Sequence, residues 1–163
     1  MGDKQNNGRP GVDADGLSSL ALAFVGDAVF NLFVRTMLVG SGKKVRDLHR
    51  DAVNFVRASA QAGILRKIER YLTDREKDIV RVARNAKVNT VPKNADIMDY
   101  HYSTGFEALL GYLYLTGQNE RLNKILMASY ELARTQDLPP KFTGKGKNNP
   151  GGETPGDDAH QQG

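Results

Sequence analysis

The segment that decides the fold reads GLSSLALAFVGDAVFNLFVRTMLV, from Gly16 to Val39. Wound as a helix, this segment carries apolar side chains nearly all round its axis, which predicts a helix buried at the centre of the domain. One carboxylate, Asp27, interrupts the apolar run directly after Gly26. Because glycine destabilises a helix by about 1 kcal/mol relative to alanine, we expect Gly26 to permit the close approach of another backbone or of a ligand.

A second carboxylate lies in a similar setting much later in the chain. Glu107 interrupts the apolar run FEALLGYL, which spans residues 106–113. An ionised carboxylate among apolar side chains is costly unless it is paired, hydrogen-bonded or bound to a cation. Asp27 and Glu107 therefore suggest one shared site for Mg²⁺, which prefers oxygen ligands and retains several waters.

Simpler interpretations of both carboxylates stay open at this point. Asp27 could lie at the solvated edge of a mostly buried helix, or pair with Arg35 or Arg57. Glu107 could belong to the surface stripe of an amphipathic helix.

The rest of the central chain is also helical by pattern. No segment shows a convincing two-residue period, and the sequence has no internal repeat and no phosphate-binding glycine motif. We therefore predict an all-α domain. Thr73 and Glu76 have the spacing of a capping box, and Ser103 or Thr104 is expected to cap the helix of Glu107. The expected segments are a short turn at 45–50, helices at 51–70, 74–86, from 103–104 to about 116, and 119–136, and a loop at 87–99.

Composition divides the 163 residues into one domain and two tails. Residues 1–13 and 141–163 are poor in large apolar side chains, so we expect a disordered N-terminal segment and a flexible tail around a domain at 14–140. The chain has no cysteine, which excludes disulfides and thiolate zinc sites. We see no secretory signal, and the apolar stretch at 17–34, broken by polar residues, falls short of a membrane span. We therefore expect a cytoplasmic protein with no membrane partner.

A basic stretch precedes the helix of Glu107. The net charge of the chain is +4, and the whole excess falls within residues 14–140, which suits a polyanionic partner. No acid lies between Asp78 and Asp96, and cations there are well placed to hold a phosphate backbone. The alternative is a solvated helix end, where the helix dipole favours cations in any case. The candidate RNA-binding residues are Arg81, Arg84, Lys87 and Lys93.

Two motifs resemble those of the ribonuclease III family. LAFVGDAV, at 22–29, is similar to the first acidic helix of that family, and FEALLG, at 106–111, is similar to the second. The chain resembles the bacterial Mini-III branch more closely, and this resemblance covers residues 16–136. Mini-III proteins are similar to a ribonuclease III catalytic domain without the double-stranded RNA-binding domain. Three stretches carry this closer resemblance: LALAFVGDA at 20–28, RNAK at 84–87 and YHYSTGFEAL at 100–109.

The resemblance implies a ribonuclease III-like helical bundle that cleaves double-stranded RNA with Mg²⁺, for which Mn²⁺ is expected to substitute. It implies that Asp27 and Glu107 are the catalytic and metal-binding residues, and that hydrolysis leaves a 5′-phosphate and a 3′-hydroxyl. It also implies a homodimer and precursor 23S ribosomal RNA as the substrate, and it leaves room for a ribosomal protein as an accessory factor.

Two positions depart from the pattern of the larger family. That family has a glutamate and an aspartate where this chain has Ala23 and Thr104, and Mini-III proteins share the reduced set. We therefore expect weak metal affinity, with water and RNA phosphate completing the coordination shell. The alternative function is that of a non-catalytic RNA-binding or ribosome-associated protein on the same fold.

Overall fold

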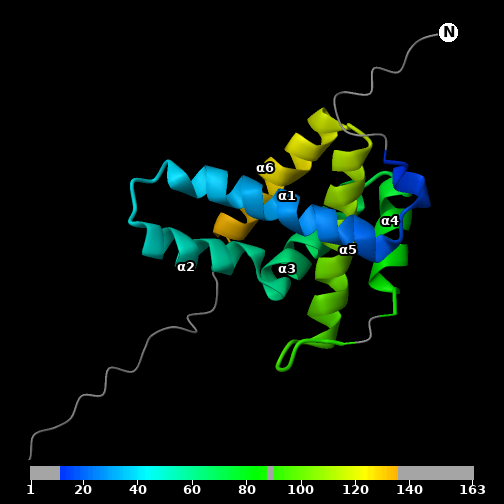
Figure 1. The fold of residues 1–163 in the computed structure, drawn as a ribbon, viewed down its shortest axis with the longest axis horizontal. Helices are drawn as coiled ribbons and strands as arrows, with labels where there is room; N and C mark the ends of the chain where they lie inside the picture. Colours follow the sequence, from blue (N-terminus) through cyan, green and yellow to red (C-terminus); the bar gives the residue numbers. More distant parts are fainter. Residues whose placement is uncertain (1–11, 88–89, 136–163) are drawn as a thin grey trace, which may run out of the picture.

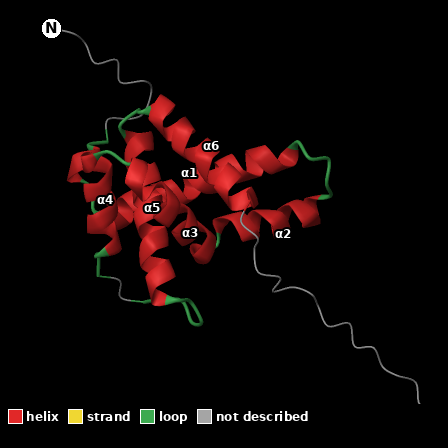
Figure 2. Ribbon diagram, turned by 180° about the vertical axis from the view of Figure 1, so that it is seen from behind, coloured by secondary structure: helices red, strands yellow, loops and turns green. Residues whose placement is uncertain are grey.

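The computed structural model describes residues 12–87 and 90–135, and all regular structure in these two ranges is helical (Figure 2). The prediction of an all-α domain is confirmed. Of the predicted tails, residues 1–11 and 141–163 lie outside the described residues, as does the end of the predicted domain at 136–140. The elements are α1 (Ser19–Val39), α2 (Val45–Val56), α3 (Ala58–Ile68), α4 (Asp74–Arg84), α5 (Ile97–Leu115) and α6 (Asn119–Thr135), with short 3₁₀ helices η1 (Ala14–Gly16) and η2 (Glu69–Tyr71).

Helix α5 is the centre of the domain (Figure 1). Helices α1, α3 and α4 all pack against it, and α2 runs back beside α1. The ring of Phe106 in α5 meets the ring of Phe30 in α1 edge-on, with 5.1 Å between centroids. Leu109, Leu110 and Leu113 of α5 have no exposed surface, so this helix supplies much of the hydrophobic core.

Helix α1 is buried on one face only. Its opposite face leaves Phe24 82% and Leu32 69% exposed. The prediction of a helix buried all round is therefore wrong, because the apolar residues surround α1 whereas the domain covers one side of it. The buried residues, mostly four positions apart, are Leu22, Ala23, Gly26, Phe30, Val34 and Leu38.

Helix α1 is also long and apolar enough, by length and composition alone, to cross a membrane. The expectation that its sequence falls short of a span is wrong in that respect. The central helix of a globular domain passes the same test, and α1 packs along α5 through its buried face.

Two helices, α2 and α3, replace the short turn predicted at 45–50 and the single helix predicted at 51–70. They are separated at Arg57, whose extended backbone (φ −62°, ψ 149°) turns the chain. Neither glycine nor proline marks this break in the sequence. The carbonyl of Val56, at the end of α2, accepts a hydrogen bond from Gln61 Nε2 at 2.7 Å.

Helix α5 begins at Ile97, earlier than the start predicted at Ser103 or Thr104. Asp96 is its N-cap, and the Asp96 side chain accepts a backbone N–H of the first turn at 2.9 Å. The hydroxyls of Ser103 and Thr104 instead donate to the carbonyl of Tyr100 inside the helix, both at 2.9 Å.

Candidate active site

Gly26 and Gly111 bring the backbones of α1 and α5 into contact. A Cβ atom on Gly26 would lie 1.7 Å from the carbonyl oxygen of Glu107, and one on Gly111 would lie 2.0 Å from that of Leu22. The expectation of a close backbone approach at Gly26 is confirmed. Because Asp27 directly follows Gly26, the same contact places Asp27 beside Glu107.

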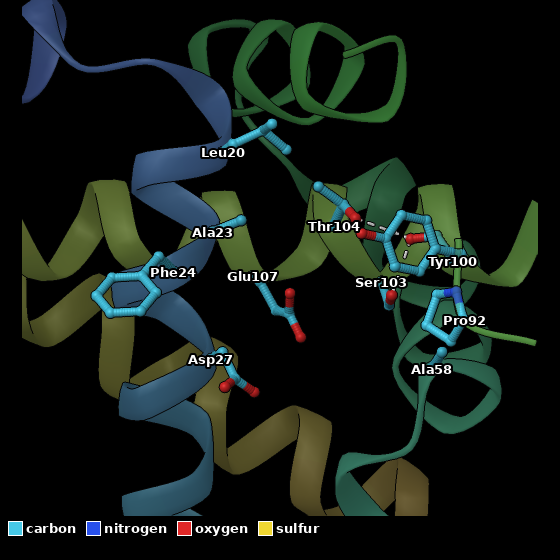
Figure 3. Close-up of a pocket in the computed structure, with 10 residues that line it drawn as sticks. All are labelled: Leu20, Ala23, Phe24, Asp27, Ala58, Pro92, Tyr100, Ser103, Thr104 and Glu107. Carbon is cyan, nitrogen blue, oxygen red and sulfur yellow. Dashed lines mark hydrogen bonds between the residues drawn. The ribbon is translucent and has the colours of Figure 1, made fainter. Parts of the chain in front are cut away.

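Asp27 and Glu107 project into one open pocket lined by α1, α3, α5 and the segment before α5 (Figure 3). The pocket has a volume of about 560 Å³, which leaves room for a hydrated cation and a phosphate group, since one water occupies about 30 Å³. The structure thus brings together the two carboxylates that the sequence singles out. The lining residues are Leu20, Ala23, Phe24, Asp27, Ala58, Pro92, Tyr100, Ser103, Thr104 and Glu107.

The carboxyl group of Glu107 has a strongly perturbed pKa. Burial, and to a smaller extent the negative charge of Asp27, raise the pKa of Glu107 from 4.5 to about 7, while a hydrogen bond with the Gln61 side chain acts in the opposite direction. Asp27 Oδ1 accepts a hydrogen bond from Asn31 Nδ2 at 2.9 Å. Across the described ranges, neither carboxylate forms an ion pair with a basic side chain. The pocket therefore holds two neighbouring acids that no basic side chain of the described residues pairs with.

The simpler interpretations of these carboxylates hold only in part. Asp27 is exposed, as a solvated helix edge would have it, but its side chain faces the pocket and Glu107 (Figure 3). Arg35 and Arg57 form no ion pair with Asp27 in the part of the chain that the structure describes. Glu107 is half-buried rather than part of a surface stripe.

The donor set of the pocket suits magnesium. Within residues 12–87 and 90–135, no three His, Cys, Asp or Glu side chains cluster around one point, so the pocket offers two carboxylates. Magnesium is commonly held by one or two carboxylates together with water and substrate phosphate. Asp27 and Glu107 therefore fit a weakly held ion whose coordination shell the substrate completes.

Comparison with known proteins agrees with this geometry. The family model of the ribonuclease III domain matches residues 20–118, a range that contains both acidic motifs. The chain belongs to the ribonuclease III family. The Mini-ribonuclease 3 of a Thermoanaerobacter species is 50% identical over 117 residues, which cover 71% of this chain and 82% of that protein. The Mini-ribonuclease 3 of Symbiobacterium thermophilum is 52% identical over 114 residues, which cover 69% and 88%.

A solved structure also resembles this ribonuclease III domain. The crystal structure of a protein from Fusobacterium nucleatum is 32% identical and superposes with a TM-score of 0.68, covering 73% of this chain and 96% of that one. The predicted Mini-III resemblance and the ribonuclease III fold are both confirmed. The protein is an endoribonuclease of the ribonuclease III family, whose enzymes act on double-stranded RNA.

The two departures from the larger ribonuclease III family lie inside the pocket. Ala23 and Thr104 both line it, and each is 6% exposed. Ala23 offers only a methyl group, and the hydroxyl of Thr104 already donates a hydrogen bond to the carbonyl of Tyr100. The pocket of this chain therefore has two fewer carboxylates than the pattern of the larger family would place there.

The basic residues predicted to bind RNA do not line the pocket of the ribonuclease III domain. Arg84 is half-buried: its guanidinium lies 3.6 Å from the ring centroid of Tyr102, and its Nη1 lies 3.4 Å from Glu69 Oε1. Packing of α4 against α5 thus accounts for Arg84 without RNA. Pro92, which does line the pocket, ties the segment before α5 to the acidic site. The exposed candidates are Arg81, Lys87 and Lys93.

Two residues at the candidate site were not predicted from the sequence. Tyr100 of α5 lines the pocket. Gln61 is 1% exposed and shares a hydrogen bond with Glu107. The sequence carried a signal for Gln61, because this amide falls on the same apolar face of α3 as Ile64 and Ile68.

Proposed function

We propose that the pocket of Asp27 and Glu107 is the site of magnesium-dependent cleavage of double-stranded RNA, with 5′-phosphate and 3′-hydroxyl products. The observation that carries the proposal is the meeting of both matched acidic motifs in one open pocket, without a basic partner among the described residues. A protein that only binds RNA has no evident need for two acids that would face the phosphates of its ligand.

The two carboxylates would hold the metal, and the rest of the pocket would keep them available for it. Bound magnesium supplies an activated water and offsets the charge that develops on the scissile phosphate. Asn31 orients Asp27 through the hydrogen bond to Oδ1. Mn²⁺ is expected to substitute because it also accepts carboxylate and water ligands.

Replacing Asp27 by asparagine tests the proposal. We expect cleavage of a mixed-sequence RNA duplex in Mg²⁺ to fall by on the order of 10³-fold, because half of the protein's metal ligands are lost. Binding of the duplex should persist, with an affinity that falls as salt rises. The measurement is gel-resolved cleavage together with filter binding, repeated in EDTA.

The matched control is Glu131→Gln, which neutralises an exposed acid of α6 that pairs with Arg134 outside the pocket. This variant should cleave at the rate of the unsubstituted protein. Undiminished cleavage by Asp27→Asn would refute the assignment of the site. Salt-dependent binding without cleavage by the unsubstituted protein would favour the alternative of a non-catalytic RNA-binding protein.

We further propose that the protein acts as a homodimer, as its resemblance to the ribonuclease III family implies. The support is an apolar groove on the face of α1 that the domain leaves uncovered. Phe24, 82% exposed, lines both this groove and the acidic pocket, so a second subunit seated there would lie beside the catalytic site. Large uncovered apolar surfaces commonly mark interfaces. Further residues of the groove are Val25, Val29, Leu32, Phe33, Leu122 and Leu126.

Replacing Leu32 by glutamate is expected to convert the dimer into monomers, because a charge at the centre of an apolar interface is left without water or a partner. Sedimentation equilibrium at micromolar concentration measures the mass. Val53→Glu places the same charge at a 59% exposed position of α2 outside the groove and should remain dimeric. A monomeric unsubstituted protein would contradict the proposed dimer.

Precursor 23S ribosomal RNA is our proposed biological substrate, on the resemblance to Mini-III enzymes, together with a cytoplasmic location. Without a separate RNA-binding domain in the matched region, the catalytic body would contact the duplex itself. Arg81, Lys87 and Lys93 are exposed and near the segment that reaches the pocket, and they are proposed to contact phosphates. Arg84 is proposed with them, beside its packing over the ring of Tyr102 in α5. A ribosomal protein that presents the RNA is compatible with this arrangement.

A further inference from the structure

Gln61 is a polar side chain buried beside the acidic pocket. It is 1% exposed and lies on the apolar face of α3, which packs against α5. Its Oε1 atom is buried and has no hydrogen-bond partner. An apolar side chain of similar length would avoid the cost of burying this oxygen, so another interaction must favour an amide at this position.

The amide nitrogen of Gln61 provides that interaction. It has two N–H groups, and the carbonyl of Val56 at the end of α2 accepts one of them at 2.7 Å. The Gln61 side chain also acts on the carboxyl group of Glu107, whose pKa it lowers by hydrogen bonding against the larger effect of burial. Because the Val56 carbonyl belongs to the backbone, the amide is fixed in place, and it can fix the carboxylate in turn.

We infer that Gln61 is a positioning residue that holds the Glu107 carboxylate facing Asp27 across the pocket. The inference deepens the proposed function, since it assumes that this carboxylate binds the metal. An amide suits the role because it donates a hydrogen bond without neutralising the acid, whereas a lysine or arginine would compete with the cation. Partners of this kind commonly change metal affinity by about 10- to 100-fold.

The substitution Gln61→Met tests the inference, because methionine keeps the length of the side chain and removes both donors. The full-length, metal-free protein is titrated with Mn²⁺ alone, and the free ion is followed by electron paramagnetic resonance. We expect about tenfold weaker Mn²⁺ binding than in the unsubstituted protein. The carboxyl ¹³C signal of Glu107 should also titrate at higher pH, because the hydrogen bond that lowers its pKa is lost.

The matched control is Ile64→Val, which alters a fully buried side chain on the same helix without touching a polar group. It should change folding stability while leaving Mn²⁺ affinity and the titration of Glu107 as they were. Equal loss of Mn²⁺ affinity in Gln61→Met and Ile64→Val would overturn the inference, because loosening of α3 would then account for both.

A second measurement does not depend on the folding of Gln61→Met. In the unsubstituted protein, the side-chain amide protons of Gln61 should shift at the pH where Glu107 ionises, and this shift should vanish in Glu107→Gln. The inference would be overturned if the chemical shifts of these amide protons did not change when Glu107 ionises, or if Gln61→Met bound Mn²⁺ with unchanged affinity. Failure of the proposed function would give a different result, because Asp27→Asn would then still cleave RNA.

Discussion

Replacing Gly26 by alanine is expected to destabilise the domain by more than about 4 kcal/mol, an exceptional loss for a single substitution. The added Cβ would lie 1.7 Å from the carbonyl oxygen of Glu107. Both atoms belong to helix backbones, so relief requires α1 and α5 to move apart along their whole contact. Alanine's better helix propensity, worth about 1 kcal/mol, offsets little of this cost. Denaturant unfolding followed by far-ultraviolet circular dichroism measures the difference.

Gly40→Ala is the matched control for this substitution. Gly40 ends α1 with helical backbone angles, and no atom lies within 4 Å of the position that its Cβ would take. Alanine there should leave the protein unchanged or stabilise it by about 0.4–1 kcal/mol, through the lower entropy of the unfolded chain. A Gly26→Ala protein within about 1 kcal/mol of the unsubstituted one, below the usual cost of overpacking, would contradict the close helix crossing.

Local sequence chemistry predicted the features that depend on a few neighbouring residues. The capping box of Thr73 and Glu76 is present at the start of α4, because its two hydrogen bonds form within one turn. Gly26 could be recognised as a contact point because a glycine inside an apolar helix has no local advantage. The two carboxylates stood out for the same reason, since an acid in an apolar run needs a partner that the run does not contain.

Tertiary contacts determined what the sequence could not predict. The break at Arg57 carries no glycine or proline, and the bond from Gln61 to the Val56 carbonyl helps to satisfy the end of α2. The exposed face of α1 is as apolar as its buried face, so composition alone could not distinguish a buried core helix from one with an uncovered side. Likewise, Gln61 lies on the apolar face of α3, and only the packing of α3 against α5 brings it to Glu107.

Replacing Glu107 by glutamine is expected to abolish cleavage and at the same time stabilise the metal-free protein. The pKa of Glu107 is raised from 4.5 to about 7 in the folded protein. As pH rises from 4.5 to 7, the unfolded chain therefore releases a proton that the folded protein still holds, and folding stability falls. Above pH 7 both states are ionised and the loss is complete, at up to about 3 kcal/mol for a shift of this size.

Glutamine escapes this loss because it stays neutral. Glu107→Gln should therefore match the unsubstituted protein below about pH 4.5 and exceed it in stability at pH 8, measured by denaturant unfolding in EDTA. Saturating Mg²⁺ should narrow the gap, because it stabilises only the protein that binds it. Glu131→Gln, which removes an exposed ion pair, should change stability by less than about 1 kcal/mol at either pH.

We expect the same ionisation to set the pH dependence of cleavage. Metal binding requires the carboxylate form of Glu107, so cleavage at limiting Mg²⁺ should fall as pH drops below about 7. Higher Mg²⁺ should move this fall to lower pH, because the ion competes with the proton for the same oxygens.

If Glu107→Gln were no more stable than the unsubstituted protein at pH 8, the raised pKa would be wrong. If the pH at which cleavage falls did not change with the Mg²⁺ concentration, the group that takes up the proton would not be a ligand of the metal. The opposite effects expected on stability and cleavage follow from one cause, which is that Asp27 and Glu107 face each other in one open pocket and pair with no basic side chain of the described residues.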